Sequence, residues 1–310
     1  MRVPQPLIIL SPPRGFSSVV STVIGQHPEL YGFPELNIFL GDQMSDIKNY
    51  FRGTYPGGLL RTIAELHAGE QTLATVLDAY AWLEQRLDWP TKKMYDYILY
   101  CIAPKIGVEK SPRTCTKPKH LQRTYAYYPK AYYLHLTRNP VAARKSIREF
   151  AEAMRRKREK YSDAEAYADK IAMFIHDPVL MMVWYRMHDN ILKLTAELPV
   201  GQTMRIRGED VLSEPEFYLT QLAAWMGIRT DAEAIEEMKH PENSPYACPG
   251  PAPLAPGGND GKFMRDPYLR VGKIKEASVH KEIEKAGLLK TWGEDFSKRF
   301  LRMSGTIGYY

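Results

Sequence analysis

The sequence predicts an α/β protein in which helices flank both faces of a central parallel sheet. Short, continuously apolar runs that indicate buried strands alternate with longer segments of helical periodicity along the 310 residues. Strands are expected at residues 7–10, 131–137 and 203–208. Helices between successive strands supply the crossovers that parallel pairing requires, so this alternation favours a parallel sheet over an antiparallel one.

The first elements are a strand, a basic turn and a helix. A serine and two prolines at 11–13 end the apolar run Leu7–Leu10. Over residues 17–26 the valines and isoleucines recur at helical spacing, behind a start rich in serine and glycine. We therefore expect the first strand to lead through a short loop into the N-terminus of a helix.

The rest of the chain is expected to be mostly helical. We interpret residues 40–100 as a helical insertion or cap over the sheet, and Asn139 and Pro140 as the N-cap and first residue of a later helix. A Pro/Gly-rich loop occupies 240–265, and because no repeat or linker is evident, residues 1–310 are interpreted as a single domain. Further helices are expected at 141–160, 178–196, 214–228 and 276–300.

The composition favours an anionic ligand and a reducing compartment. The net charge is +6, yet the basic residues are scattered rather than interleaved with aromatic residues as in nucleic-acid binders. The three cysteines, at 101, 115 and 248, suit neither a disulfide framework nor a zinc site. The start is unlike a signal peptide, and no apolar run reaches the roughly 18 residues of a membrane helix. We expect a cytoplasmic protein without a metal, a membrane span or a nucleic-acid partner.

The loop "SPPRGFSS" at residues 11–18 has the composition of an anion site. Free backbone N–H groups and the positive end of the helix dipole face outward where a strand feeds a helix N-terminus. Arg14 adds a positive charge there, and Ser17 and Ser18 add hydroxyl donors. The loop lacks the lysine of a Walker A motif. On spacing alone, a plain strand–helix turn that carries an arginine fits equally well.

The second strong strand ends in a similar way. Arg138 follows the strand at 131–137, and Ser146 comes eight residues later. Ligands of open α/β sheets bind at the carboxyl ends of the strands. Two strand ends that each carry an arginine and a serine predict a ligand with two separated phosphates, whereas a surface ion pair is the alternative role for Arg138.

These two elements resemble those of sulfotransferases that use 3′-phosphoadenosine 5′-phosphosulfate (PAPS). The loop at 11–18 is similar to the family's PPRSGST loop, which binds the 5′-phosphosulfate, and the spacing of Arg138 and Ser146 matches the family's 3′-phosphate element. The resemblance covers residues 5–270 and is nearest to bacterial members met near polyketide and natural-product pathways. Other similar stretches are GQHPELYGFPELNIF (25–39), VEKSP (108–112), RGEDVLSEPE (207–216) and GGNDGKFMRDP (257–267).

The resemblance implies a P-loop-like three-layer sandwich that transfers a sulfuryl group from PAPS to an acceptor hydroxyl, with 3′-phosphoadenosine 5′-phosphate (PAP) as product and no metal. Phe16 stands where the family loop has glycine, and Gly15 would then provide the close backbone approach to phosphate, displaced by one residue. A disordered surface loop is the alternative for Lys262 and Arg265. The nucleotide-binding residues so implied are Pro13, Arg14, Gly15, Phe16, Ser17, Ser18, Arg138, Ser146, Lys262 and Arg265.

The same resemblance suggests the catalytic residues. Arg14 and Lys110 would neutralise charge on the bridging oxygen of the leaving PAP. Glu35 matches an acidic residue of bacterial members and is the first candidate base, with a helix cap or ion pair as its alternative role. His67, on a helix with Arg61, is the second candidate base, although a lone histidine is more often structural. The histidine that follows the Lys-Thr pair of animal cytosolic members is absent here.

The acceptor is expected to be a small or carrier-bound apolar metabolite, and a homodimer is compatible with the sequence. This expectation depends on aromatic and methionine residues that could equally be ordinary core, namely Tyr95, Tyr97, Met173, Phe174, Met181, Met182 and Trp184. Three other functions stay open. They are a sulfotransferase-like protein that binds PAP without turnover, a P-loop-like phosphotransferase, and a nucleotide- or RNA-binding module.

Overall fold

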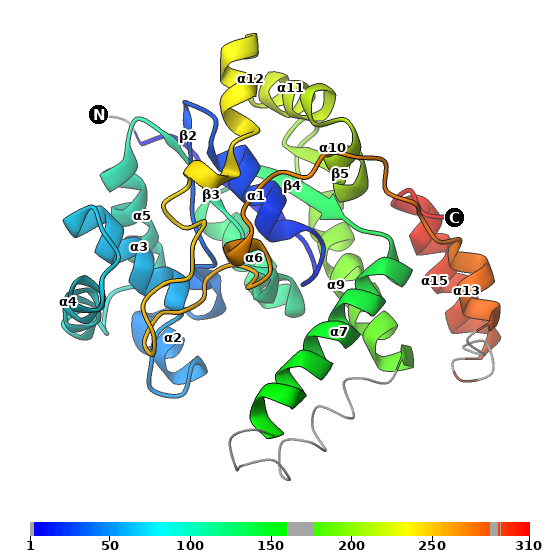
Figure 1. The fold of residues 1–310 in the computed structure, drawn as a ribbon, viewed down its shortest axis with the longest axis horizontal. Helices are drawn as coiled ribbons and strands as arrows, with labels where there is room; N and C mark the ends of the chain where they lie inside the picture. The colour runs from blue at the N-terminus through cyan, green and yellow to red at the C-terminus, as the bar shows by residue number, and fades with distance from the viewer. Residues whose placement is uncertain (1–2, 160–176, 286–290, 292) are drawn as a thin grey trace.

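The computed structural model describes residues 3–159, 177–285, 291 and 293–310, and its centre is a five-stranded sheet (Figure 1). Each strand is parallel to its neighbours, and the order across the sheet is β2-β3-β1-β4-β5. The first strand of the chain is therefore the central one, as expected of a ligand-binding α/β sheet. The strands are β1 (Leu7–Leu10), β2 (Leu30–Gly32), β3 (Ile106–Glu109), β4 (Tyr132–Thr137) and β5 (Thr203–Arg207).

Strand β1 shows why the sheet is buried on both faces. All four of its residues are apolar and at most 1% exposed. Ile8 and Leu10 pack into one hydrophobic cluster, and Leu7 and Ile9 pack into another on the opposite face. Successive side chains of a strand point to opposite faces, so a continuous apolar run fits a parallel sheet covered on both sides.

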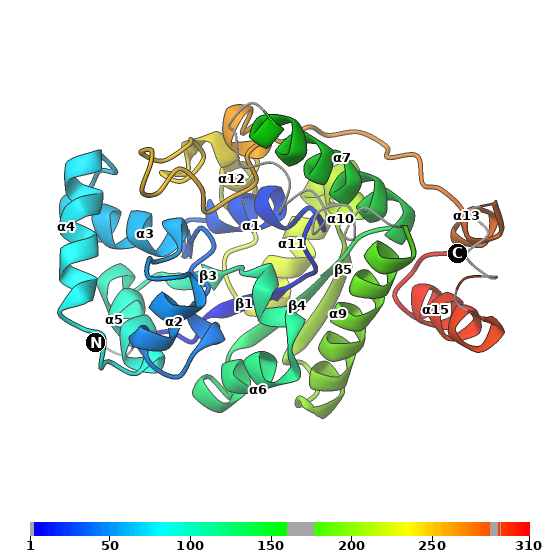
Figure 2. The same cartoon turned by 90° about the horizontal axis from the view of Figure 1, so that it is seen from below.

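Helices cover both faces and complete a three-layer arrangement, which confirms the predicted fold class. Figure 2 shows α1 and α12 on one side of the sheet and α6 and α9 on the other. The longer helices are α1 (Ser17–Gly25), α3 (Gly57–Ala68), α4 (Leu73–Glu84), α5 (Thr91–Ile102), α6 (Pro118–Tyr127), α7 (Pro140–Glu159), α9 (Asp177–Glu197), α11 (Pro215–Met226) and α15 (Glu294–Thr306). The short helices are α2 (Met44–Tyr50), α10 (Gly208–Ser213), α12 (Ala232–Met238) and α13 (Val279–Lys285), with 3-10 turns η1 (Ile38–Leu40), η2 (Pro112–Thr116), η3 (Pro241–Asn243) and η4 (Phe263–Arg265).

Most of the expected elements are confirmed. Residues 40–100 contain α2, α3, α4 and α5. The Asn139 side chain caps α7, because its Oδ1 accepts hydrogen bonds from the N–H of Val141 at 3.0 Å and of Ala142 at 3.3 Å. Strands β2 and β3 were not predicted from the sequence. They are three and four residues long and each contains a glycine, so their apolar signal is weak.

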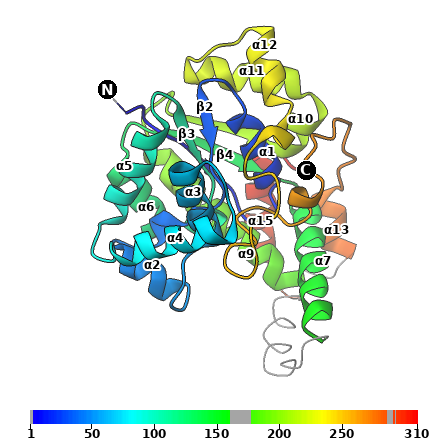
Figure 3. The same cartoon turned by 60° about the vertical axis from the view of Figure 1, so that its left-hand side comes forward.

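The single helix expected at 276–300 is a wrong prediction. The structure has α13 there, then α15 from Glu294, which follows Gly293 at a φ of 76°. A residue in this left-handed backbone conformation cannot continue an α-helix, so α15 begins after it. Figure 3 shows α13 beside α7. Residues of α13 and α15 form a third hydrophobic cluster with residues of α7 and α9.

Candidate active site

The loop between β1 and α1 turns through backbone conformations that are uncommon for residues other than glycine. Arg14 and Phe16 have φ values of 63° and 61°, in the left-handed region. Gly15 lies between them, and a Cβ atom there would come 2.2 Å from Ser11 Oγ. The side chains of Ser17 and Ser18 are buried at the start of α1. The expected sequence of strand, tight loop and helix N-terminus is thus confirmed.

Lys110 is the centre of a buried polar cluster beside this loop. It follows β3 directly and its side chain is 0% exposed. Its Nζ donates hydrogen bonds to Ser18 Oγ at 3.3 Å, Glu35 Oε1 at 3.1 Å and Asn259 Oδ1 at 3.1 Å. The three partners come from α1, from the segment after β2 and from the loop after α12. A buried ammonium group is tolerated only when it is paired and hydrogen-bonded, and these partners meet that need.

Glu35 reaches this cluster from a tightly packed segment between β2 and η1. Its backbone N–H donates to Gly258 O at 2.7 Å. A Cβ atom at Gly58, in the first turn of α3, would lie 2.3 Å from the Glu35 carbonyl oxygen, so a glycine is needed there. The Glu35 side chain is 29% exposed, so its carboxylate is paired with Lys110 while it stays accessible to an incoming molecule.

Arg138 and Ser146 contact the loop after β1 directly. The Nη1 atom of Arg138 donates to the carbonyl oxygen of Arg14 at 2.7 Å, and Arg14 Nε donates to Ser146 Oγ at 3.0 Å. Neighbouring strands β1 and β4 make this possible, because their carboxyl ends lie side by side. Two sequence elements about 130 residues apart thus form one basic site.

The loop after α12 covers this site, and two of its residues were not predicted as functional. Asp260 pairs with Arg14, and its backbone N–H donates to Ser18 Oγ at 2.9 Å. Asn259 contacts Lys110, as described above. Arg61 of α3 is fully buried and anchors the same loop through Gly257 O at 3.0 Å. In Figure 1 this gold segment runs from α12 around to the front of α1. The GGND stretch at 257–260 was noted in the sequence, but no role was predicted for Asn259 or Asp260.

The sequence and the fold agree with those of known proteins. A model of the sulfotransferase family matches residues 6–232. The chain belongs to the sulfotransferase family. One similar solved structure is the sulfotransferase domain from the curacin biosynthetic pathway, with a TM-score of 0.69 and 21% identity, covering 100% of this chain and 99% of that one. Another is the sulfotransferase domain from the Synechococcus PCC 7002 olefin synthase, with a TM-score of 0.66 and 20% identity, covering 87% of this chain and 86% of that one. A comparison with curated protein sequences found no match.

Lys262 and Arg265, the two basic residues predicted to contact the 3′-phosphate, lie on the outer side of the loop after α12. Lys262 is 66% exposed and its Nζ pairs with Glu149 of α7 at 3.2 Å. Arg265 is exposed on η4. Neither is among the residues that contact Lys110 in the buried cluster. Their expected role over the 3′-phosphate therefore stays a prediction.

His67, the second candidate base, does not lie in the polar cluster around Lys110. It is the penultimate residue of α3, whereas the first turn of that helix packs against Glu35. Its Nε2 is 2.7 Å from the hydroxyl of Tyr97, and its ring meets that of Trp82 at a centroid distance of 4.9 Å. Burial, with a smaller effect of Arg86, lowers the pKa of His67. Gly58, which contacts Glu35, lies nine residues before His67 on α3. A helix rises 1.5 Å per residue, so the two positions are roughly 14 Å apart along the helix axis.

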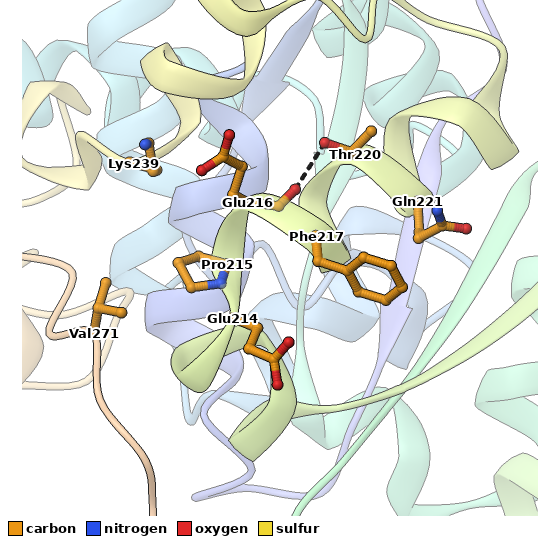
Figure 4. Close-up of a pocket in the computed structure, with 8 residues that line it drawn as sticks. All are labelled: Glu214, Pro215, Glu216, Phe217, Thr220, Gln221, Lys239 and Val271. Carbon is orange, nitrogen blue, oxygen red and sulfur yellow. Dashed lines mark hydrogen bonds between the residues drawn. The ribbon is translucent and has the colours of Figure 1, made fainter.

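A hollow of about 640 Å³ on the sulfotransferase surface lies apart from the cluster (Figure 4). The first residues of α11 line this hollow, with Lys239 and Val271 on one side and Phe217 on the other. Glu214 and Glu216 also line it. Two carboxylates against one lysine do not suit a polyanionic nucleotide.

The residues expected to line an acceptor pocket are mostly placed in hydrophobic clusters. Tyr95 is fully buried in the hydrophobic cluster that contains Ile8 and Leu10, and Met181 and Trp184 are buried with residues of α13 and α15. Met173 and Phe174 lie outside the described residues. Within the described ranges no group of three or more His, Cys, Asp or Glu residues could hold a metal ion. Of the helices that the structure describes, none has the length and apolarity to cross a membrane.

A buried carboxylic acid supports the segment that carries Glu35. Glu109, the last residue of β3, accepts a hydrogen bond from the Ser111 hydroxyl, and Ser111 Oγ accepts one from the Asn37 N–H at 2.8 Å. Asn37 Nδ2 donates to the Glu35 carbonyl oxygen at 3.3 Å. Burial raises the pKa of Glu109 to about 7, and the hydroxyl of Ser111 and the charge of Lys110 oppose that rise.

This raised pKa predicts how stability changes with pH. The folded state holds the Glu109 proton up to about pH 7, whereas the unfolded chain loses it near pH 4.5. Unfolding between these values releases a proton, so this group's contribution to stability is complete below the lower pKa and is lost as the pH rises to about 7. Glu109→Gln should remove that loss, on the order of 3 kcal/mol. Urea denaturation at pH 4 and pH 7 measures it, and an equal stability difference between variant and wild type at both pH values would contradict the assignment.

Proposed function

We propose that this sulfotransferase moves a sulfuryl group from PAPS to the hydroxyl of an acceptor and releases PAP. The observation that carries the proposal is the hydrogen bond from Arg14 Nε to Ser146 Oγ at 3.0 Å. It joins the two candidate anion elements, at the ends of β1 and β4, beside the pair formed by Lys110 and Glu35. A nucleotide with phosphate groups at both its 5′ and 3′ positions matches two such elements.

The proposed reaction is a direct displacement at sulfur. The acceptor oxygen attacks the sulfur atom while the bond from sulfur to the bridging phosphate oxygen breaks, and the acceptor proton passes to the Glu35 carboxylate. Charge grows on the bridging oxygen of PAP as that bond breaks. Lys110 and Arg14, together with the first N–H groups of α1, would stabilise this charge. Because Lys110 Nζ lies 3.1 Å from Glu35 Oε1, the proposed base and the proposed cation stand beside the same reacting atoms.

The acceptor class is proposed from the similar structures. Two of these are sulfotransferase domains from a biosynthetic pathway and from an olefin synthase. We infer a small or carrier-bound metabolite hydroxyl as the acceptor. The loop at residues 250–260 would have to let it reach Glu35, which this loop contacts through Gly258.

An assay of PAP release tests the proposal. The protein is incubated with PAPS and a panel of apolar alcohols, free and attached to a carrier protein through phosphopantetheine, and PAP is quantified by chromatography. Release of PAP that depends on an acceptor and yields a sulfated product supports the proposal. Transfer from ATP with none from PAPS would favour the phosphotransferase alternative, and tight PAP binding without turnover on any acceptor would favour a protein that has lost catalysis.

Replacing Arg138 with Ala is expected to weaken PAP binding by about 10- to 150-fold, because a charged hydrogen bond to the 3′-phosphate is lost. Binding of 5′-AMP, which has no 3′-phosphate, should change little. Calorimetric titration of both nucleotides gives the two ratios. An equal loss for PAP and 5′-AMP would place Arg138 elsewhere on the ligand.

A further inference from the structure

Phe16 is an unusual residue for its position in the loop after β1. Its φ of 61° and ψ of 10° lie in the left-handed region, where a bulky side chain is disfavoured. It forms the N-cap of α1, yet its side chain makes no capping hydrogen bond. A strained backbone of this kind persists only where surrounding contacts compensate for it. The contacts of the Phe16 ring therefore indicate what the position is for.

One face of the ring carries the guanidinium group of Arg138. The Arg138 Cζ atom lies 3.9 Å from the ring centroid, which is stacking distance for a cation on an aromatic face. The ring also packs closely against the start of α10. A Cβ atom at Gly208 would lie 2.6 Å from Cδ2 of Phe16, so only glycine leaves room for the ring. The ring is thus fixed between α10 and Arg138.

The rest of Arg138 has few fixed contacts. Its Nη1 donates to the Arg14 carbonyl oxygen at 2.7 Å. Its Nε is buried and has no hydrogen-bond partner among the residues that the structure describes. None of the ion pairs found between described residues includes Arg138. Stacking on the ring and one carbonyl therefore set the plane of the guanidinium and leave other N–H donors available.

We propose that Phe16 is a positioning residue that holds the Arg138 guanidinium for the 3′-phosphate of the donor, and so sets the preference for 3′-phosphorylated nucleotides. The inference rests on the proposed function. A guanidinium stacked on an aromatic face presents its N–H groups at its edge, in the plane that suits a phosphate. An arginine without this support would have to lose rotamer freedom on binding, which weakens the contact.

The test compares two nucleotides that differ only in the 3′-phosphate. Calorimetry gives the dissociation constants of PAP and 5′-AMP for wild type, Phe16→Leu and Phe16→Tyr. Phe16→Leu should weaken PAP binding by about 3- to 30-fold, the range of a cation–π contact, and change 5′-AMP binding little. Phe16→Tyr keeps the ring face and should retain the wild-type ratio. In an Arg138→Ala background, Phe16→Leu should cause no further loss for PAP.

Phe150→Leu is the matched control. The Phe150 ring lies under the neighbouring Arg14, with Cζ 5.5 Å from the centroid, and is half exposed on α7. Because Arg14 is placed at the 5′ side, this substitution should change PAP and 5′-AMP binding by the same factor. A second probe, pentafluorophenylalanine at position 16, keeps the shape of the ring and reverses its quadrupole, so it tests the contact even if Phe16→Leu does not fold.

The outcomes separate the inference from the proposed function. If wild type binds PAP and 5′-AMP alike, the proposed function fails and Phe16 has no 3′-phosphate to act on. If wild type prefers PAP, but Phe16→Leu and the fluorinated ring leave that preference unchanged, the inference is overturned while the proposed function stands. An equal loss for both nucleotides would also overturn it, because the ring would then only shape the loop.

Discussion

Glu35→Gln is expected to lower kcat for sulfuryl transfer by about 10²- to 10⁴-fold, the usual contribution of a general base. Glutamine keeps the size of the side chain and can still accept a hydrogen bond from Lys110, but it cannot take the acceptor proton. The carboxylate contacts no anion element of the site directly, so the dissociation constant of PAP should change by less than threefold or so. Steady-state kinetics and PAP calorimetry on the same preparations measure both quantities.

Glu84→Gln provides a matched control for this variant. Glu84 also pairs with a lysine, Lys48, at 2.6 Å, and its side chain is 32% exposed against 29% for Glu35. It lies on α4 and is no part of the cluster around Lys110. Its substitution should leave kcat near the wild-type value. If Glu35→Gln retains more than about a third of the wild-type kcat, Glu35 is a structural ion-pair partner and another group removes the proton.

Lys110→Met is expected to lower kcat by about 10²- to 10³-fold, which is the loss measured when one donor to a developing charge is removed. Methionine has a similar length and no charge, so it fits the fully buried position without leaving a large cavity. The interaction with the bridging oxygen grows as the bond to sulfur breaks. The acceptor KM should therefore change much less than kcat.

Lys48→Met is the control for the lysine substitution. It breaks the half-buried pair with Glu84 and should leave kcat near the wild-type value, because that pair is no part of the cluster around Lys110. The kcat and KM values of the two lysine variants are compared on one acceptor, with circular dichroism to verify folding. A folded Lys110→Met protein with kcat within tenfold of wild type would mean that Lys110 only links Ser18, Glu35 and Asn259.

Arg14, Ser18, Arg138 and Ser146 were predicted from local patterns, each in one strand and the loop and helix that follow it, whereas Glu35 and Lys110 were predicted from the resemblance to the sulfotransferase family. Arg14 and Ser18 were identified because a short apolar run leads into a basic, hydroxyl-rich turn. Arg138 and Ser146 were identified in the same way at the next strand. These residues could be predicted because a strand and the helix that follows it in sequence determine where the loop between them lies.

The parts that were missed depend on packing between distant segments. Asp260 and Asn259 meet Arg14 and Lys110 across 246 and 149 positions of sequence, and no periodicity reveals such a contact. His67 shares α3 with the glycine that contacts Glu35, yet it lies at the other end of the helix. Strands β2 and β3 owe their pairing to their neighbours in the sheet rather than to their own propensity.

The most direct test of the account is calorimetric titration of the wild-type protein with PAP, with 5′-AMP and ATP as comparisons. The arrangement of Arg14 and Arg138 at adjacent strand ends predicts that PAP binds in the micromolar range and at least tenfold more tightly than 5′-AMP, because the charged contact to its 3′-phosphate is worth that much or more. Equal binding of PAP and 5′-AMP, or no binding of either, would contradict the assignment of this basic site to the sulfuryl donor.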